Sequence, residues 1–250
     1  MTITRAIELI RQSSRTAALT GAGVSTDAGI PDFRSPTGLW SDPQAMARLS
    51  AWGFRLFPKK FYETALTLLP SLLAARPTET HRLLVRLEQA GKLRWIITQN
   101  IDGLHQAAGS TSVIELHGTY RQCRCTRCGQ SIGLAEVLAR GNPKDLPPRC
   151  GCGGILKPDL VLFGDPLPGE VLARALEVVA QCDLLMVLGS SLVVYPAAEL
   201  PRRAREAGAK IIIVNREPTP YDDIADVVLH IELSEFCTAL AAQWDLITGE

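Results

Sequence analysis

Short apolar runs alternate with amphipathic helical segments along most of the chain. Ile3, Ile7 and Ile10 recur at helical spacing, and the run TAALT at 16–20 has the length of a buried strand. Further strand-length runs lie at 94–98, 113–116, 184–189, 210–215 and 227–231, and helical patterns lie at 79–90, 170–181 and 197–208. This alternation predicts an α/β fold, in which helices cover both faces of a parallel sheet.

Two stretches interrupt the alternation. Residues 37–78 contain aromatic residues and prolines without a strand pattern, which indicates a helical insertion. Residues 119–157 contain a cysteine cluster and many turn formers, but few apolar residues for a core of their own. We therefore expect a small domain made of these two insertions, seated on a main domain made of 1–36, 79–118 and 158–250.

The cysteine cluster has the spacing of a metal site. Cys125 and Cys128 form a CxxC knuckle, and Cys150 and Cys152 form a tighter CxC pair further along. Two thiolate pairs at this separation predict one tetrahedral Zn²⁺ site, which would be structural because four thiolates leave no position for water. The alternative is a set of buried or free thiols without a metal. Cys123 competes with Cys125 as a ligand, but Cys125 has the usual knuckle spacing to Cys128.

Composition narrows the class of protein. The 250 residues include 26 Lys plus Arg and 26 Asp plus Glu, so no net charge attracts nucleic acid or an anionic membrane. The start of the chain lacks the continuous apolar region of a signal peptide, and the longest apolar run is too short for a bilayer. Seven cysteines, five of them clustered between Cys123 and Cys152, indicate a reducing compartment. We expect a cytoplasmic protein without a nucleic-acid or membrane partner.

Polar residues follow the carboxyl ends of the predicted strands, which meet at one edge of a parallel sheet, where ligands bind. They are the glycine loop 21–35, Gln99, Asn100, Asp102, His117, Ser190, Ser191 and Asn215. Each has a structural alternative: turn formation or helix capping for Asn100, Asp102 and the serines, and a satisfied histidine at a domain junction for His117. The convergence of five strand ends favours a functional crevice.

Several motifs, in order, resemble the sirtuins, the NAD-dependent protein lysine deacylases, and specifically their prokaryotic type. They are GAGVSTDAGIPDFRS, TQNIDGLH, ELHGTY, the cysteine pairs, LKPDLVLFGDPLP, GSSLVVYPAAELP and the VN at 214–215. The resemblance runs from about residue 3 to residue 245. It implies a Rossmann-like parallel sheet with a smaller domain made of a zinc ribbon and a helical insertion.

The resemblance also implies a reaction that consumes NAD. The acyl oxygen of acyl-lysine attacks C1′ of the nicotinamide ribose, nicotinamide leaves, and the resulting imidate collapses to lysine and O-acyl-ADP-ribose. His117 would be the general base, acting through a ribose hydroxyl, because an imidazole titrates near neutral pH. Asn100 would orient the ribose or a water molecule, and Asp102 would hold the nicotinamide carboxamide.

By the same resemblance, NAD would lie on residues at the ends of five of the predicted strands. The implied set is Gly21, Ala22, Gly23, Thr26, Asp32, Phe33, Arg34, Gln99, Asn100, Ile101, Asp102, Gly189, Ser190, Ser191, Asn215 and Glu232. Backbone N–H groups of the small residues would approach the pyrophosphate, with Arg34 adding positive charge. Phe33 would cover the nicotinamide.

The expected partner is an acetylated protein, whose acyl-lysine segment would add as a strand between 161–165 and 190–196. The implied contacts are Val161, Leu162, Phe163, Gly164 and Val193. Family members that prefer succinyl or malonyl groups carry Tyr followed three positions later by Arg, whereas Tyr62 is followed by Ala65 here. This difference favours acetyl or longer apolar acyl groups.

Three other functions are weighed against deacetylation. Mono-ADP-ribosyl transfer would use the same fold and NAD with a protein nucleophile. A hydride-transferring dehydrogenase is disfavoured because the loop reads GxGx₅G rather than GxGxxG. A zinc-ribbon adaptor without chemistry is disfavoured by the balanced charge and the polar strand ends.

Overall fold

A computed structural model describes residues 2–32, 42–140 and 145–248. Six parallel strands form the main sheet: β1 (Thr16–Thr20), β2 (Trp95–Thr98), β3 (Val113–Glu115), β7 (Leu184–Leu188), β8 (Lys210–Val214) and β9 (Val227–Leu229). Their order is β3-β2-β1-β7-β8-β9, so the direction of winding reverses between β1 and β7. Ligands of doubly wound sheets bind at such a reversal. The predicted α/β class with a parallel sheet is confirmed.

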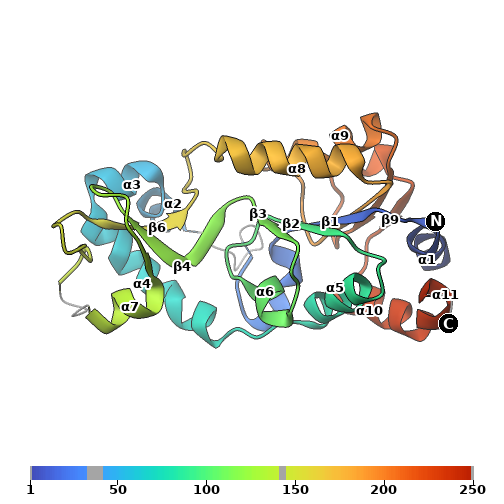
Figure 1. The fold of residues 1–250 in the computed structure, drawn as a ribbon, viewed down its shortest axis with the longest axis horizontal. Coiled ribbons are helices and arrows are strands. Elements are labelled where there is room, and N and C mark those ends of the chain that lie inside the picture. The colour runs from blue at the N-terminus through green and yellow to red at the C-terminus, as the bar shows by residue number, and fades with distance from the viewer. Residues whose placement is uncertain (1, 33–41, 141–144, 249–250) are drawn as a thin grey trace.

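Helices cover both faces of this sheet, as Figure 1 shows. One face carries α8 (Gly169–Gln181) and α9 (Leu200–Glu206), and the other carries α1 (Ile3–Gln12), α5 (Glu79–Gln89), α6 (Leu104–Ala108), α10 (Leu233–Ala242) and α11 (Trp244–Thr248). Each face has its own apolar core, because the all-buried central strands β1 and β7 send alternate side chains to opposite sides. The predicted helices at 79–90 and 170–181 match α5 and α8 to within one residue.

The helical insertion comprises α2 (Pro43–Arg48), α3 (Ala51–Leu56) and α4 (Pro58–Ala74), with no strand among its described residues. Side chains cap the first two helices: Asp42 accepts from the backbone N–H of Gln44, and Ser50 accepts from that of Gly53. Edge-to-face contacts join the rings of Phe54, Phe61 and Tyr62 in a separate small core. The aromatic residues of this insertion thus provide its packing.

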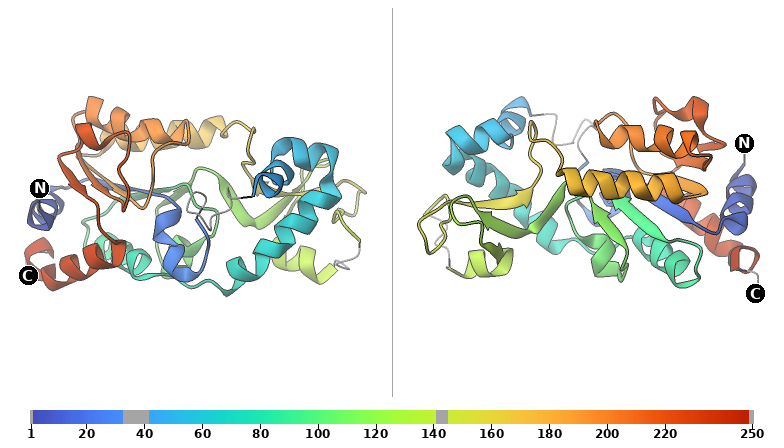
Figure 2. Two further views of the ribbon diagram at one scale, coloured as in Figure 1. Left: turned by 180° about the vertical axis from the view of Figure 1, so that it is seen from behind. Right: turned by 45° about the horizontal axis from the view of Figure 1, so that its top comes forward.

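The cysteine module contains a three-stranded antiparallel sheet of order β5-β4-β6 and one helix. Its elements are β4 (Gly118–Cys125), β5 (Ser131–Gly133), α7 (Leu134–Arg140) and β6 (Leu156–Leu160). Figure 2 shows this module and α2–α4 together at one end of the molecule, with both chain termini at the opposite end. The site described below lies where the main sheet meets this end.

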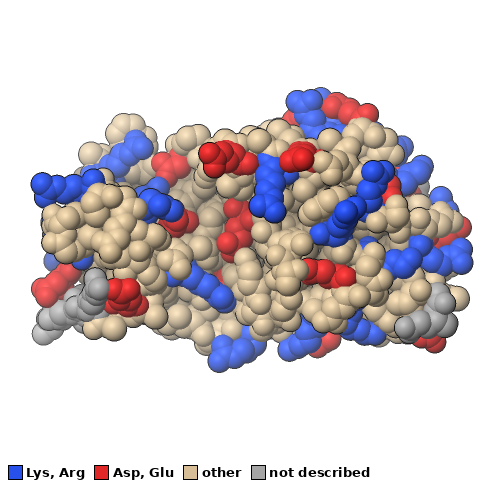
Figure 3. Space-filling model, viewed as in Figure 1, with Lys and Arg blue, Asp and Glu red and all other residues tan. Residues whose placement is uncertain are grey.

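The surface agrees with the zero formal charge. Side chains of both signs are interspersed over the face in Figure 3. Within the described ranges, no helix has the length and apolar character needed to cross a membrane.

Candidate active site

The glycine loop lies tightly against the end of β7. The backbone N–H of Gly21 donates to the carbonyl of Leu188 (3.1 Å), and that of Gly23 donates to the carbonyl of Gly189 (3.0 Å). A Cβ on Gly23 would lie 2.7 Å from the Cα of Gly189, whose φ is +59°. Only glycine fits such an approach without displacing backbone. The loop continues as two short 3₁₀ helices, η1 (Ala22–Val24) and η2 (Thr26–Ala28), at the reversal point of the sheet.

His117 follows β3 and is held by a backbone carbonyl. Its Nδ1 lies 2.7 Å from the carbonyl oxygen of Gln99. Because a carbonyl can only accept, Nδ1 carries the proton and Nε2 keeps its lone pair. Burial lowers the pKa of His117, and the hydrogen bond to Gln99 opposes this in part. A neutral imidazole with a free Nε2 has the properties of a general base.

A buried network joins the loop after β2 to the glycine loop. The Ser25 hydroxyl donates to Oδ2 of Asp102 (2.7 Å), and Nδ2 of Asn100 donates to the Ser25 oxygen (3.1 Å). All three side chains are buried. Asp102 also accepts from the backbone N–H of Leu104 (2.8 Å), so the turn-forming alternative holds for this residue as well, while the N-cap of α6 is Gly103. Sequence reasoning did not single out Ser25, although its place inside the loop between Gly23 and Thr26 was a signal.

Four more of the predicted NAD contacts follow strands of the main sheet. Nε2 of Gln99 donates to the hydroxyl of Ser190 (2.9 Å), which links the ends of β2 and β7. Asn215 follows β8 and donates to the carbonyl of Glu217 (2.7 Å). Glu232 lies after β9, is exposed, and forms an ion pair with Arg216, in which Oε1 of Glu232 is 3.5 Å from Nη1 of Arg216. Their roles toward NAD stay predictions.

Other members of the predicted set lie in the described loops or just outside them. Ile101 accepts a backbone hydrogen bond from Tyr120 (3.2 Å), which docks the loop after β2 onto β4. Asp32 is the last described residue of the glycine loop. Phe33 and Arg34 lie outside the described residues, so their predicted contacts with nicotinamide and phosphate stay predictions.

The predicted peptide-binding segment 161–165 is anchored to His117 at the end of the main sheet and to the helical insertion. The backbone N–H of Val161 donates to the carbonyl of His117 (2.9 Å), and that of Ala51 donates to the carbonyl of Phe163 (3.0 Å). The side chain of Leu162 is buried in the aromatic core of the helical insertion, so it would serve a peptide only through its main chain. In the other predicted peptide-binding segment, 190–196, Val193 is exposed.

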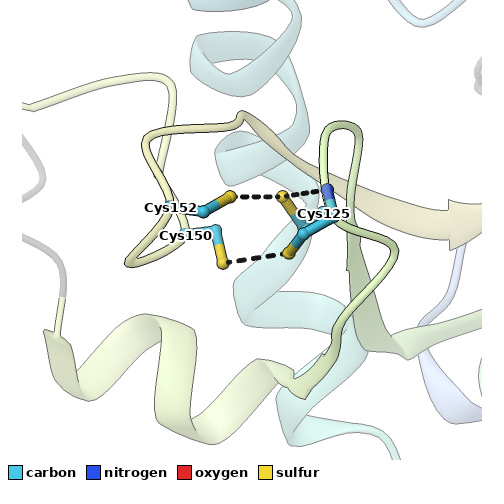
Figure 4. Close-up of side chains that lie close together, drawn as sticks. Cys125, Cys150 and Cys152 are labelled. Carbon is cyan, nitrogen blue, oxygen red and sulfur yellow. Dashed lines mark hydrogen bonds between the residues drawn. The ribbon is translucent and has the colours of Figure 1, made fainter.

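The four predicted zinc ligands converge. The Sγ atoms of Cys125, Cys128, Cys150 and Cys152 all lie within 4.8 Å of one another. Figure 4 shows the sulfur atoms of Cys125, Cys150 and Cys152 pointing into one space between two loops. Cys125 and Cys152 are 3.5 Å apart at sulfur, and Cys128 and Cys150 are 3.8 Å apart. A tetrahedral zinc with bonds of about 2.3 Å requires sulfur separations of about 3.8 Å.

Two further features support this cluster as a metal site. Backbone N–H groups of Cys128 and Arg127 point at the sulfur of Cys125 and lower its pKa to about 6, which favours the thiolate that binds a metal. The CxC pair turns through Gly153, which has a φ of +85°. Cys123 lies outside the group of four and packs in the apolar core of the module, where burial raises its pKa to about 11.

Comparisons with known proteins agree with this geometry. The model of the Sir2 family matches residues 21–196, which is more than half of the chain. A relative from Sulfurisphaera tokodaii, described as an NAD-dependent protein deacetylase, is 45% identical over 229 residues, covering 92% of this chain and 90% of its own.

Two solved structures have the same fold as this chain. A complex described as Sir2 with p53 peptide and NAD⁺ is 38% identical, with a TM-score of 0.89 over 98% of this chain and all of its own. A Sir2 variant with deacetylated p53 peptide and 3′-O-acetyl ADP-ribose is also 38% identical, with a TM-score of 0.90 over 97% and 98% of the two chains. On the family match and these similarities, the chain belongs to the Sir2 family.

Proposed function

We propose that this protein is an NAD-dependent protein lysine deacetylase, which converts acetyl-lysine and NAD to lysine, nicotinamide and O-acetyl-ADP-ribose. The observation that carries this function is the position of His117, whose imidazole is neutral, has its Nδ1 proton held by Gln99 and stands at the edge where the glycine loop and Asn100 meet. The relative and the two complexes described above support the same chemistry.

The residues of the site divide the work of this reaction. Bound NAD supplies the ribose carbon that receives the acyl group and the nicotinamide that leaves. Nε2 of His117 removes a proton from a ribose hydroxyl, and the carbonyl of Gln99 stabilises the imidazolium that results. Asp102, held by Ser25, orients the carboxamide, and Asn100 orients the ribose. The side chains of Ser25, Asn100 and Asp102 are buried, which limits the access of water to the site.

Two structural features fit bound NAD. The loop 21–28 lies at the reversal point of the sheet, which is the position used by dinucleotide phosphates in doubly wound folds. Gln99 and Ser190 present amide and hydroxyl groups beside it. Together with Asn215 they supply the neutral hydrogen-bonding groups that a ribose requires.

We propose that acetylated peptide segments bind between 161–165 and 190–196 through main-chain hydrogen bonds. Phe163 already pairs with Ser50 on one side in a parallel bridge. A peptide would therefore use the opposite edge, with Phe163 and Val193 contributing exposed apolar side chains.

For the four-cysteine cluster, we propose one structural Zn²⁺ ion. Two of the sulfur separations, 3.5 and 3.8 Å, are close to those of a tetrahedral Cys₄ site. Among the described residues of the module, the buried apolar cluster has six members, two of which are the ligands Cys125 and Cys150. The zinc ribbon (119–157) and helical insertion (37–78) would then form a small domain on a main domain made of 1–36, 79–118 and 158–250.

Acetyl and longer apolar acyl groups are the proposed substrates. The hydroxyl of Tyr62 donates to the carbonyl of Leu156, and its ring is buried among aromatic residues. Tyr62 is thus occupied in joining the insertion to β6, and Ala65 offers no charge to an acidic acyl group.

The test is a deacetylation assay on an acetyl-lysine peptide with and without NAD. We expect lysine to appear only with NAD, with one nicotinamide released for each acetyl group lost. Acetyl, succinyl and myristoyl peptides in parallel would measure the acyl preference. Deacetylation without NAD would refute the proposal, and a target that gains ADP-ribose while keeping its acetyl group would identify an ADP-ribosyltransferase instead.

Zinc is tested on the same preparation by elemental analysis. We expect about one Zn per chain, as four ligands predict. A folded, active protein without metal would contradict the structural role of the cluster.

A further inference from the structure

Two histidines outside the proposed mechanism are buried side by side beneath the active site. His81 lies on α5 and His105 on α6, with 0% and 1% of their surfaces exposed. Their ring centroids are 4.6 Å apart, and the rings are tilted by 54°. Nε2 of His81 and Nδ1 of His105 are buried without a hydrogen-bond partner among the described residues. Each ring therefore forms hydrogen bonds through one nitrogen only, which is Nδ1 in His81 and Nε2 in His105.

His81 is connected to the glycine loop. Its Nδ1 lies 2.8 Å from the hydroxyl oxygen of Thr78, and in the tautomer with a proton on Nδ1 it donates to that oxygen. The same hydroxyl donates to the carbonyl of Val24 (2.8 Å), inside the loop. Since Ser25 is the next residue, the position of Val24 determines where the hydroxyl that holds Asp102 lies.

His105 is connected to the opposite wall of the site. Its Nε2 lies 2.9 Å from the hydroxyl of Thr20, which donates to the hydroxyl of Thr98 (2.9 Å). Thr98 in turn accepts from the backbone N–H of Asn100 (3.1 Å). This chain runs across the ends of β1 and β2, and all its side chains are buried.

We propose that the His81–His105 pair positions the two walls of the NAD site relative to each other. One ring is tied to the glycine loop, the other is tied to Asn100, and ring contact joins them. A buried network with this geometry holds its members more rigidly than separate hydrogen bonds do. Burial keeps both imidazoles neutral, so the rings do not repel each other as cations. The inference rests on the proposed function, because the aligned groups are those assigned to NAD.

The test exploits the different nitrogens that the two rings use. An Asn side chain places a polar atom near the position of Nδ1, and a Gln side chain places one near Nε2. We therefore expect His81→Asn and His105→Gln to keep kcat/KM for NAD close to that of the unchanged protein. The swapped variants, His81→Gln and His105→Asn, should lose about tenfold, the size expected when a buried hydrogen bond is lost.

Thr80→Val is the matched control, because it changes a buried polar side chain of α5 that contacts Cys237 rather than the loop. It should leave kcat/KM for NAD unchanged. The melting temperature of each variant shows whether it folds, and calorimetric titration with NAD measures affinity without turnover.

The proposal is overturned if the Asn and Gln variants of each histidine lose the same amount of kcat/KM for NAD, in proportion to the decrease in their melting temperatures. The two histidines would then contribute only to packing of the core. Wild-type kinetics in all four variants would overturn the proposal too. A wild-type protein that binds NAD but does not deacetylate would contradict the proposed function alone, since the order of NAD affinities among the variants would still test the positioning role.

Discussion

Lowering the pH from about 8 to about 6 should destabilise the protein through His81 and His105. Burial lowers the pKa of His81 to about 4 and that of His105 to about 3. The carboxylate of Asp102 opposes the shift of His81, and the charge of Arg82 adds to it, while His81 adds to the shift of His105. In the unfolded chain both imidazoles take up protons near pH 6.5. The unfolded state thus binds more protons in this range, and stability falls as the pH decreases below about 6.5.

The size of this loss of stability follows from the protonation equilibria of the two histidines in the folded and unfolded states. With native pKa values near 4 and 3, both imidazoles stay essentially neutral in the folded protein at about pH 6. Each unfolded imidazole then gains about 0.8 kcal/mol from protonation relative to pH 8, or about 1.6 kcal/mol for the pair. The loss is complete only as the pH falls through the native pKa values.

Urea unfolding of the zinc-replete protein at the two pH values measures this difference. The double variant His81→Asn/His105→Gln should lose about 1.6 kcal/mol less on acidification than the wild type, because it lacks both imidazoles and all other titrating groups cancel in the comparison. His230→Gln reports the effect of removing an exposed imidazole. An equal pH dependence in the wild type and the double variant would show that the pair is not buried and neutral as described.

Three further changes probe other parts of the molecule. Cys150→Ser should abolish stoichiometric zinc binding, measured by elemental analysis, and lower the melting temperature, because three thiolates and a hydroxyl make a weaker site. Gly23→Ala should weaken NAD binding by about tenfold or more in calorimetry, because its Cβ would lie 2.7 Å from the Cα of Gly189; unchanged affinity would refute the packing argument. Asp165→Asn should raise KM for the peptide about fivefold while KM for NAD stays constant, because two basic side chains pair with this mostly buried carboxylate at the end of the peptide-binding segment 161–165. Asp159→Asn, which breaks a more exposed pair on β6, is its control, and equal effects of the two would contradict the special role of Asp165.

Local patterns were sufficient for most elements of the main domain. The alternation of apolar runs and helical segments predicts its sheet because buried parallel strands and amphipathic helices leave strong, short-range signatures. The short helix α6, with five residues, and the strands of the cysteine module were not predicted. Few buried residues line the elements of the cysteine module, where the proposed metal ligation and contacts with the rest of the chain would take the place of periodicity.

By itself, the sequence determined the α/β class, the four-cysteine cluster and the gathering of polar residues at the strand ends, because these depend on spacing along the chain and on a general property of parallel sheets. Only the tertiary structure decided which nitrogen of His117 is free, that Ser25 holds Asp102, and that His81 and His105 meet beneath the site. These facts depend on contacts between residues far apart in the chain, where the identity of one residue carries no information about its partner. Strand order and the burial of each group, which no local pattern encodes, set those contacts.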